Sequence, residues 1–167
     1  MQLKKAEAQD LAPIRAMFSC LVDAMRRDGI MIWDDVYPNE IFAEDVDQGR
    51  LYVLYDGDTV VSAFALCSEC SGQDAVEWRE NNASALYLFR LGVNVDYLRR
   101  GIGSLMIKES IRLTSELGAK YLRLFVVDSN KPAIDMYLKN GFWQAEGAYD
   151  QTIGDRCLHE FGFEINV

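Results

Sequence analysis

The hydrophobic positions of this chain follow two different periods in turn. Short runs that are apolar throughout or alternate with polar residues predict strands at residues 2–6, 51–55, 59–67, 85–95 and 121–127, with two more in the tail around 142–151 and 156–165. Apolar positions three and four apart predict a helix that starts after Asp10, which serves as its cap, and ends at Gly29. Further helices are expected shortly after Asn39, at 101–117 and at 131–140.

This order of elements predicts an α/β (α+β) fold. We expect a single mixed, largely antiparallel sheet of about six to seven strands, flanked by about four helices, in one domain that covers residues 1–167. The hairpin signal Asp56-Gly57-Asp58 supports antiparallel pairing of the strands on either side of it. The polar stretch SGQDAVEWRENN is assigned no element.

The predicted helix at 101–117 has an imperfect apolar stripe. Its apolar members are Ile102, Leu105, Met106, Leu113 and Leu117, but Glu109 falls inside the stripe. Ile107 and Ile111 lie on the far side, which indicates a second packing neighbour.

Composition narrows the classes of partner. The formal net charge of −9 argues against a nucleic-acid surface, which requires clustered positive charge. The beginning MQLKKAEAQD lacks the apolar run of a signal peptide, and no stretch approaches the roughly 20 apolar residues of a membrane span. We therefore expect a cytoplasmic protein with no membrane partner. Cys67 and Cys70 form one C-x-x-C without further ligands, so they are read as reduced thiols and no metal is expected.

The stretch RRGIGSLMI, residues 99–107, suggests an anion site. Two arginines and two glycines precede a predicted helix, whose first N–H groups lack partners and carry partial positive charge. Glycines let a bulky anion approach the backbone, and successive N–H groups then form a nest for phosphate oxygens. The alternative reading is a simple turn with solubilising arginines. A dinucleotide fingerprint is excluded because Met106 stands at its third glycine.

A second motif follows about thirty residues later, in DSNKPAIDMYLKNGF, residues 128–142. Ser129 or Asn130 can cap a helix with Pro132 in its first turn. Tyr137 lies four residues after Ala133, on the same helix face. The alternative reading of Tyr137 is a half-buried core residue.

Taken together, LGVNVDYLRRGIGSLMI and N-x-x-A-x-x-x-Y-x-x-x-GF resemble the GNAT family of N-acetyltransferases. The resemblance implies a GNAT-like acyl-CoA acyltransferase fold, acetyl-CoA as co-substrate, and Tyr137 near the sulfur of the cofactor as the catalytic acid. It also implies a bulge at Leu91-Gly92-Val93, and Gly92 within a strand fits a bulge on physical grounds. The implied cofactor-binding residues are Leu91, Val93, Arg99, Arg100, Gly101, Ile102, Gly103, Ser104 and Asn130.

Three positions, in two parts of the motif, depart from the family pattern. Leu98 stands where the family usually has Gln or Arg, so we expect weaker or rearranged contact and not lost binding. Leu86 and Leu88 occupy the strand where the family often has an acidic residue, so the sequence does not identify the general base.

In the resembled family, the segment between the first two helices borders the acceptor. Here that segment is GIMIWDDVYPNE, residues 29–40. Trp33 and Tyr37 could form an apolar, cation-attracting wall, while Asp34 and Asp35 could draw a positive amine. The alternative is a packed loop. His159, the single histidine, is read as structural.

The function we expect is transfer of an acetyl group from acetyl-CoA to a primary amine of a small-molecule or peptidyl acceptor, by direct attack in a ternary complex. The alternatives are a non-catalytic CoA- or acyl-CoA-binding regulatory module and an interaction domain that kept the fold without the ligand, because fold alone does not separate these classes. The expected partners are acetyl-CoA and an amine acceptor, without nucleic acid, and a homodimer is left open.

Overall fold

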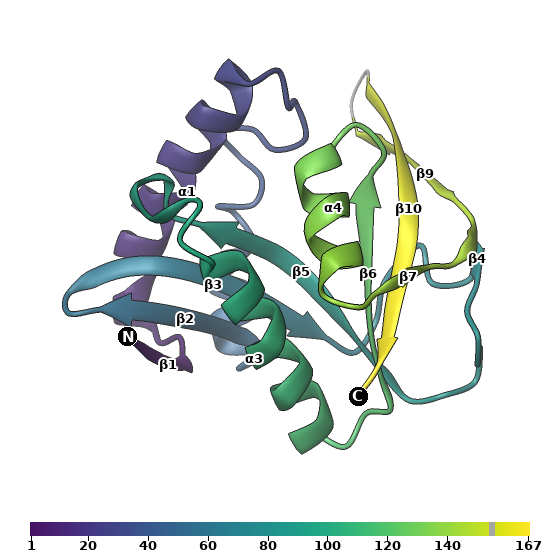
Figure 1. Ribbon diagram of the computed structural model, residues 1–167. Helices are drawn as coiled ribbons and strands as arrows, with labels where there is room; N and C mark the ends of the chain where they lie inside the picture. Colours follow the sequence, from purple (N-terminus) through teal and green to yellow (C-terminus); the bar gives the residue numbers. More distant parts are fainter. Residues whose placement is uncertain (154–155) are drawn as a thin grey trace. The chain divides into compact units, whose positions relative to one another are not determined.

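The computed structural model describes residues 1–153 and 156–167, which form four α-helices and ten strands (Figure 1). The chain divides into two compact units. The first consists of Met1–Leu66 and Phe89–Met106, and the second of Cys67–Leu88 and Ile107–Val167. Strand β5 (Ala85–Val93) and helix α3 (Ile102–Glu116) each contribute residues to both units. Coverage of 1–167 by a single domain stays a prediction.

The first unit is built on antiparallel strands with a long amphipathic helix. It contains β1 (Gln2–Lys5), α1 (Leu11–Arg27), α2 (Phe42–Asp47), β2 (Leu51–Asp56) and β3 (Thr59–Cys67), and its strand order is β1-β2-β3-β5. Phe18 of α1 is fully buried and packs on Phe42 of α2, with ring centroids 4.7 Å apart. This aromatic pair joins both helices of the unit.

The second unit is organised around one long strand. Strand β10 (Arg156–Asn166) pairs antiparallel with β6 (Tyr121–Val127), β7 (Trp143–Gln144) and β9 (Tyr149–Ile153). The parallel contact of this unit joins Ala85 to Tyr121 and continues to Tyr87 and Arg123. Helix α4 (Lys131–Lys139) lies against β6 and β10 in Figure 1.

The predicted fold class is confirmed: the protein has a mixed α/β fold with a mainly antiparallel sheet and four helices. Within the described residues the sheet has eight strands, against the six to seven expected. The difference arises in the tail, because the strand predicted at 142–151 is divided into β7, β8 (Glu146–Gly147) and β9. The polar stretch that was assigned no element contains β4 (Val76–Glu77), which pairs with β8.

The buried face of α3 differs from the predicted stripe. Leu105 and Leu117 are exposed, whereas Ile107 is fully buried. Ile102 and Met106 of the predicted stripe are buried as expected, but the buried face also includes two polar residues, Ser110 and Thr114, which are both fully buried. Their hydroxyls donate to the Ile107 and Ser110 carbonyl oxygens at 2.8 and 2.7 Å. Because the helix satisfies these hydroxyls itself, they can be buried without an outside partner, which an apolar pattern does not reveal.

The side chain of Asp10 does not cap α1 as predicted. Asp10 occupies the N-cap position, but its carboxylate instead accepts the Glu7 amide at 2.8 Å and the Tyr55 hydroxyl at 2.9 Å, and it pairs with Lys4 at 2.9 Å. The residue is 4% exposed, and its hydrogen bonds tie the start of α1 to β1 and β2. Within the described part of the chain, no helix is long and apolar enough to cross a membrane.

Candidate active site

The glycine-rich turn links β5 to α3 through the short 3-10 helix η2 (Val95–Tyr97). Arg99 and Gly101 both have left-handed backbones, with φ of 60° and 79°. Helix α3 begins at Ile102, and its first turn closes with Leu105 N–H donating to the Gly101 carbonyl at 3.0 Å. Left-handed residues ahead of a helix N-terminus turn successive N–H groups toward one point, which is the geometry of an anion nest.

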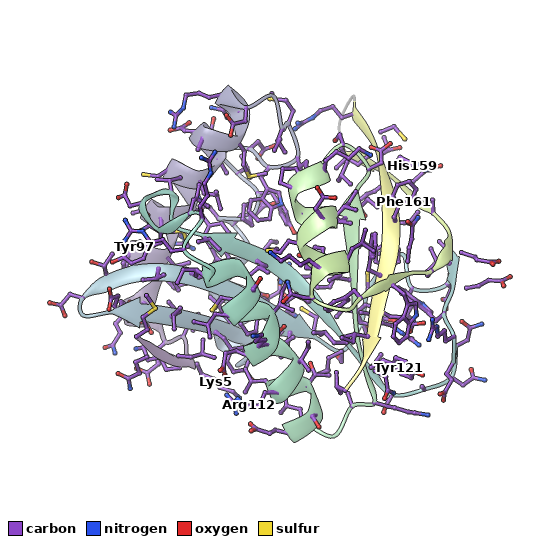
Figure 2. All side chains as sticks on the ribbon, viewed as in Figure 1. Lys5, Tyr97, Arg112, Tyr121, His159 and Phe161 are labelled. Carbon is purple, nitrogen blue, oxygen red and sulfur yellow. The ribbon has the colours of Figure 1, made fainter. Side chains whose placement is uncertain are left out.

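The space around this turn suits a phosphate group. An ideal Cβ at Gly101 would have no heavy atom within 4 Å, so its glycine is required by backbone conformation and not by crowding. Arg99 and Arg100 are exposed, and the Arg100 guanidinium lies 5.1 Å from the centroid of the Tyr97 ring. Tyr97 lies just ahead of α3 in Figure 2. The turn therefore combines left-handed backbone, the positive end of a helix and two exposed cations. These features fit a pyrophosphate.

The segment of β5 before the turn has a backbone irregularity. Arg90 has φ of 53°, immediately ahead of the Leu91-Gly92-Val93 segment where the bulge was predicted. Its guanidinium makes a double hydrogen bond to Asp45 on α2, at 2.7 and 2.8 Å, and both side chains are buried. A left-handed non-glycine residue costs about 1–3 kcal/mol, and this ion pair fixes it in place.

Gly92 is required for close packing. An ideal Cβ there would lie 2.6 Å from two ring atoms of Phe18 and 2.9 Å from Leu21. The Gly92 carbonyl accepts the Ser62 hydroxyl at 2.5 Å. The glycine thus allows α1 to approach β5, while the left-handed residue is Arg90.

The motif at the start of α4 forms as predicted, with Asn130 as the cap. Its side chain accepts the Ala133 amide at 3.4 Å, and Pro132 lies in the first turn. Tyr137 is 8% exposed and packs against Phe142 and Phe163, with centroid distances of 5.6 and 6.5 Å. Burial raises the pKa of the Tyr137 phenol well above its usual value.

The predicted acceptor loop is held by its own polar groups. Asp34 Oδ1 accepts the amides of Val36 and Tyr37 at 2.9 and 2.8 Å, and Asp34 N–H donates to the Tyr37 carbonyl at 3.0 Å. Trp33 packs on Phe18 with a centroid distance of 5.6 Å. The carboxylate of Asp34 therefore stabilises the conformation of this loop.

The predicted site residues fall into two groups. The turn, the β5 segment and the loop at 29–40 belong to the first unit, whereas Asn130 and Tyr137 belong to the second. Within the first unit, Trp33 and Gly92 both contact Phe18, so the acceptor loop and the β5 segment share one packing partner. Within the second unit, Asn130 and Tyr137 lie on the same helix.

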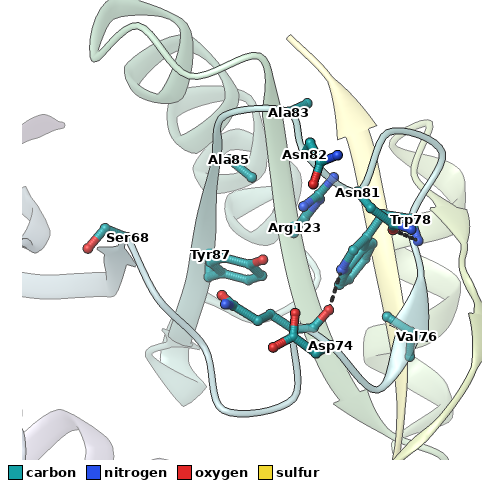
Figure 3. A pocket seen from close by; sticks show the side chains of 11 residues that line it. Ser68, Asp74, Val76, Trp78, Asn81, Asn82, Ala83, Ala85, Tyr87 and Arg123 are labelled. Atoms are coloured by element: carbon teal, nitrogen blue, oxygen red, sulfur yellow. Dashed lines mark hydrogen bonds between the residues drawn. The ribbon is translucent and has the colours of Figure 1, made fainter.

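The second unit also holds a polar cavity of about 350 Å³ that the sequence did not predict (Figure 3). Arg123 and Tyr87 point into it, and the Trp78 indole N–H donates to the Gln73 carbonyl at 2.8 Å along one wall. The Arg123 guanidinium is 4.6 Å from the Trp78 ring and donates to Glu164 at 3.2 Å and to the Glu80 carbonyl at 2.7 Å. Sequence reasoning missed these residues because the segment at 71–82 carries no periodic pattern; the buried-strand Arg in YLRLFVV was the available signal.

His159 lies beside Phe161 on β10 (Figure 2), and their ring centroids are 5.3 Å apart. Its Nδ1 is 2.6 Å from the Asp150 carboxylate on β9, and both side chains are largely exposed. This cross-strand contact agrees with a structural use of His159.

The fold is that of an acetyltransferase. The model of the acetyltransferase (GNAT) family matches residues 16–142, and the chain belongs to this family. GNAT acetyltransferases use acetyl-CoA.

Curated relatives bear acetyltransferase names. YwnH of Bacillus subtilis, whose name refers to phosphinothricin acetyltransferase, is 24% identical over 148 residues, 85% of this chain and 83% of that protein. The thialysine N-epsilon-acetyltransferase of Bos taurus is 37% identical over 87 residues, 52% of this chain and 45% of that protein.

Solved structures share the fold at low identity. A GNAT-family acetyltransferase from Streptococcus agalactiae aligns with a TM-score of 0.82 at 14% identity, over 99% of this chain and 95% of that one. The structure of yncA from Salmonella typhimurium, which contains acetyl-CoA, aligns with a TM-score of 0.71 at 14% identity, over 99% and 93% of the two chains.

Proposed function

We propose that this acetyltransferase moves the acetyl group of acetyl-CoA to a primary amine of a small-molecule or peptidyl acceptor, by direct attack in a ternary complex. The observation that carries the proposal is the left-handed turn at Arg99 and Gly101, which opens onto the N-terminus of α3. This geometry offers amide donors to a pyrophosphate, the group that distinguishes CoA from most small acyl donors.

Each cofactor-binding residue has a distinct part in the proposal. The turn from Arg99 through Gly101, Ile102 and Gly103 to Ser104 supplies N–H groups to the pyrophosphate, and Arg99 and Arg100 add charge. The backbones of Leu91 and Val93 bind the pantetheine arm, and Asn130 contacts the cofactor from the start of α4. Support for these parts is the positive φ values, the extended β5 segment and the cap geometry of Asn130.

The chemistry needs a neutral amine, a stabilised oxyanion and a proton for sulfur. An alkylammonium with a pKa near 10.4 costs roughly 4 kcal/mol to deprotonate at neutral pH. Backbone N–H near Val93 stabilises the oxyanion. Tyr137 protonates the departing thiolate; burial keeps its phenol protonated over the working pH range, and it also makes the phenol a weaker acid, so the proton moves only as the C–S bond breaks.

The acceptor is proposed to bind beside the loop at 29–40. Trp33 and Tyr37 form an apolar wall that attracts a cation, and the negative charge of Asp34 draws the amine. Two similar proteins are named for different acceptors: the Bos taurus enzyme for thialysine, and a solved structure from Escherichia coli for an alanine of ribosomal protein S18. Both acceptor classes therefore belong in the test.

The test combines binding and turnover. Acetyl-CoA at 100 times its dissociation constant should stabilise the fold by about 2.7 kcal/mol, which raises the melting temperature by roughly 5–11 °C in a chain of this length. Gly103→Val should remove the shift because a branched side chain enters the phosphate position. Ser115→Val, at an exposed position near the other end of α3, is the control and should keep it.

Thiol release from acetyl-CoA over a panel of alkylamines and peptides then separates the candidate functions. Amine-dependent release supports the transferase. A melting shift without release from any amine would favour the non-catalytic CoA-binding module. Absence of any shift at millimolar acetyl-CoA would overturn every CoA-based function.

A further inference from the structure

The polar cavity of the second unit is not used by the proposed transfer. It has a volume of about 350 Å³, and its lining residues come from the stretch 68–87 and from β6 (Figure 3). Pockets that bind small molecules begin at roughly this size, about 300 Å³. Every lining residue belongs to the second unit, so the cavity is formed by that unit alone.

The buried cation of the cavity is already neutralised. Arg123 is 2% exposed and points into the cavity, and its Nε donates to the Glu164 carboxylate at 3.2 Å. Glu164 is fully buried, and the Arg123 Nη2 also donates to the Glu80 carbonyl at 2.7 Å. Because the ion pair has no net charge, an anionic ligand would compete with Glu164 for the same guanidinium.

The aromatic rings of the cavity are packed against other side chains. Trp78 and Tyr87 are 5% and 4% exposed. The Arg123 guanidinium lies over the Trp78 ring at 4.6 Å, and Phe125 and Tyr87 meet that ring edge-on, with centroid distances of 5.6 and 6.4 Å. Stacking of a flat heterocycle needs an accessible ring face. The cavity therefore binds through hydrogen bonds and not through stacking.

Several polar groups that line the cavity have no protein partner. Burial raises the pKa of the Tyr87 phenol, and the Arg123 guanidinium acts in the opposite direction without outweighing it, so the hydroxyl keeps its proton. No described residue accepts that proton. Within residues 1–153 and 156–167, the side chains of Gln73, Asn82 and Ser68 likewise have no hydrogen-bond partner. A hydroxyl donor and two carboxamides therefore offer hydrogen bonds to a molecule in the cavity.

A carboxylate stands at the exposed side of the cavity. Asp74 is exposed, and Figure 3 shows it next to Tyr87. Among the described residues, Asp74 makes no ion pair. Its charge, together with the formal net charge of −9, disfavours an anionic ligand. The same carboxylate accepts hydrogen bonds from a neutral hydroxyl.

We propose that this cavity is a binding site for a small uncharged polyol of the size of a monosaccharide. A hydroxyl both donates and accepts, so one ligand can accept from Tyr87, donate to Asp74 and bond in either direction with Gln73 and Asn82. The volume corresponds to about a dozen water molecules at roughly 30 Å³ each, which suits a sugar ring. The site does not depend on acetyl transfer.

The experiment screens uncharged pentoses, hexoses and inositol against the wild-type protein by saturation-transfer NMR, and titrates those that bind by calorimetry. At least one should bind with a Kd of about 1 mM or tighter. Gln73→Ala and Asn82→Ala should each weaken its binding about three- to tenfold, because each removes hydrogen bonds to the ligand. Tyr87→Phe, which removes one oxygen, should have a similar effect. Gln144→Ala, at an exposed position outside the cavity, is the matched control and should bind as wild type.

A charged analogue tests the electrostatic part of the proposal. The uronic acid that corresponds to a bound hexose should bind about fivefold more weakly or worse, and Asp74→Asn should reduce this difference.

Three results would overturn the proposal. The first is that no member of the panel binds at about 10 mM. The second is equal affinity in the wild type and in the Gln73, Asn82 and Tyr87 variants, because the polyol would then lie outside the cavity. The third is tighter binding of the uronic acid than of the uncharged sugar, which would show that the cavity takes an anion.

Discussion

Asp45→Asn tests whether a buried ion pair holds the irregular segment of β5. Asp45 is fully buried and accepts two hydrogen bonds from Arg90 and one from Arg50, at 2.7, 2.8 and 2.6 Å. The amide keeps the shape of the side chain but removes the charge. It removes the buried negative charge that faces Arg90, whose side chain is 6% exposed.

The expected loss of stability follows from the burial of Asp45 and Arg90. Removal of one partner of a buried pair costs about 3–5 kcal/mol, which lowers the melting temperature by roughly 6–20 °C in a chain of this length. Arg50→Gln is the matched control. Its side chain is 23% exposed and contributes one bond to Asp45, so its loss should cost about 1 kcal/mol or less. Urea unfolding at neutral pH measures both variants.

A double-mutant cycle with Arg90→Gln tests the reasoning itself. When both partners are replaced, the loss should be clearly smaller than the sum of the single losses, because neither charge remains buried alone. Acetyl-CoA affinity should fall in Asp45→Asn, since the left-handed residue adjoins the backbone assigned to the pantetheine arm. The reasoning is refuted if Asp45→Asn stays within 1 kcal/mol of wild type, or if the two losses simply add.

Further variants test the remaining assignments. Tyr137→Phe should keep acetyl-CoA binding and lower kcat by roughly 10²-fold across the working pH range; wild-type turnover at every pH would contradict its role as acid. Trp33→Ala should raise the acceptor KM and leave acetyl-CoA affinity unchanged. Equal losses of affinity for the acceptor and for acetyl-CoA would show that the loop has a structural role. Gly92→Ala should cost about 1–3 kcal/mol in urea unfolding because its Cβ meets Phe18, and Phe18→Leu should reduce that cost. Burial raises the pKa of the Glu160 carboxyl to about 7 in the folded state, so the folded protein keeps this proton to a higher pH than the unfolded chain does. The free energy of unfolding therefore falls as the pH rises from about 4.5 to 7. Glu160→Gln should therefore gain about 1–2 kcal/mol over wild type at pH 8 and little at pH 4, as measured by thermal melts at both pH values.

Local patterns were sufficient to predict most elements and both ends of the cofactor motif. The strand at 121–127, the cap at Asn130 and the glycine turn depend on short-range chemistry: β-branched runs, a capping amide and residues that tolerate positive φ. These signals act within a few residues, so the sequence displays them directly. The positive φ of Arg99 is an exception, because arginine gives no local signal for it.

Long-range partnerships were the part that the sequence could not predict. Helix α3 buries Ser110 and Thr114 because its own carbonyls satisfy them, and no apolar stripe marks that face. Arg123 stands out as an arginine within an apolar strand, but its partner Glu164 is on β10 and is placed opposite it only by register. The pairing of β4 with β8 likewise joins segments about seventy residues apart, each only two residues long.

Four carboxylates of this protein differ in the contacts that offset the cost of burying their charge. Asp45 and Glu164 are fully buried, and each is bound to an arginine of a neighbouring strand, Arg90 or Arg123. Burial acts to raise the pKa of Asp10, but hydrogen bonds from the Glu7 amide, Lys4 and Tyr55 outweigh it and hold that pKa below its usual value. Glu160 is half-buried without such donors, and burial raises the pKa of its carboxyl to about 7. This carboxyl therefore gains and loses its proton near neutral pH.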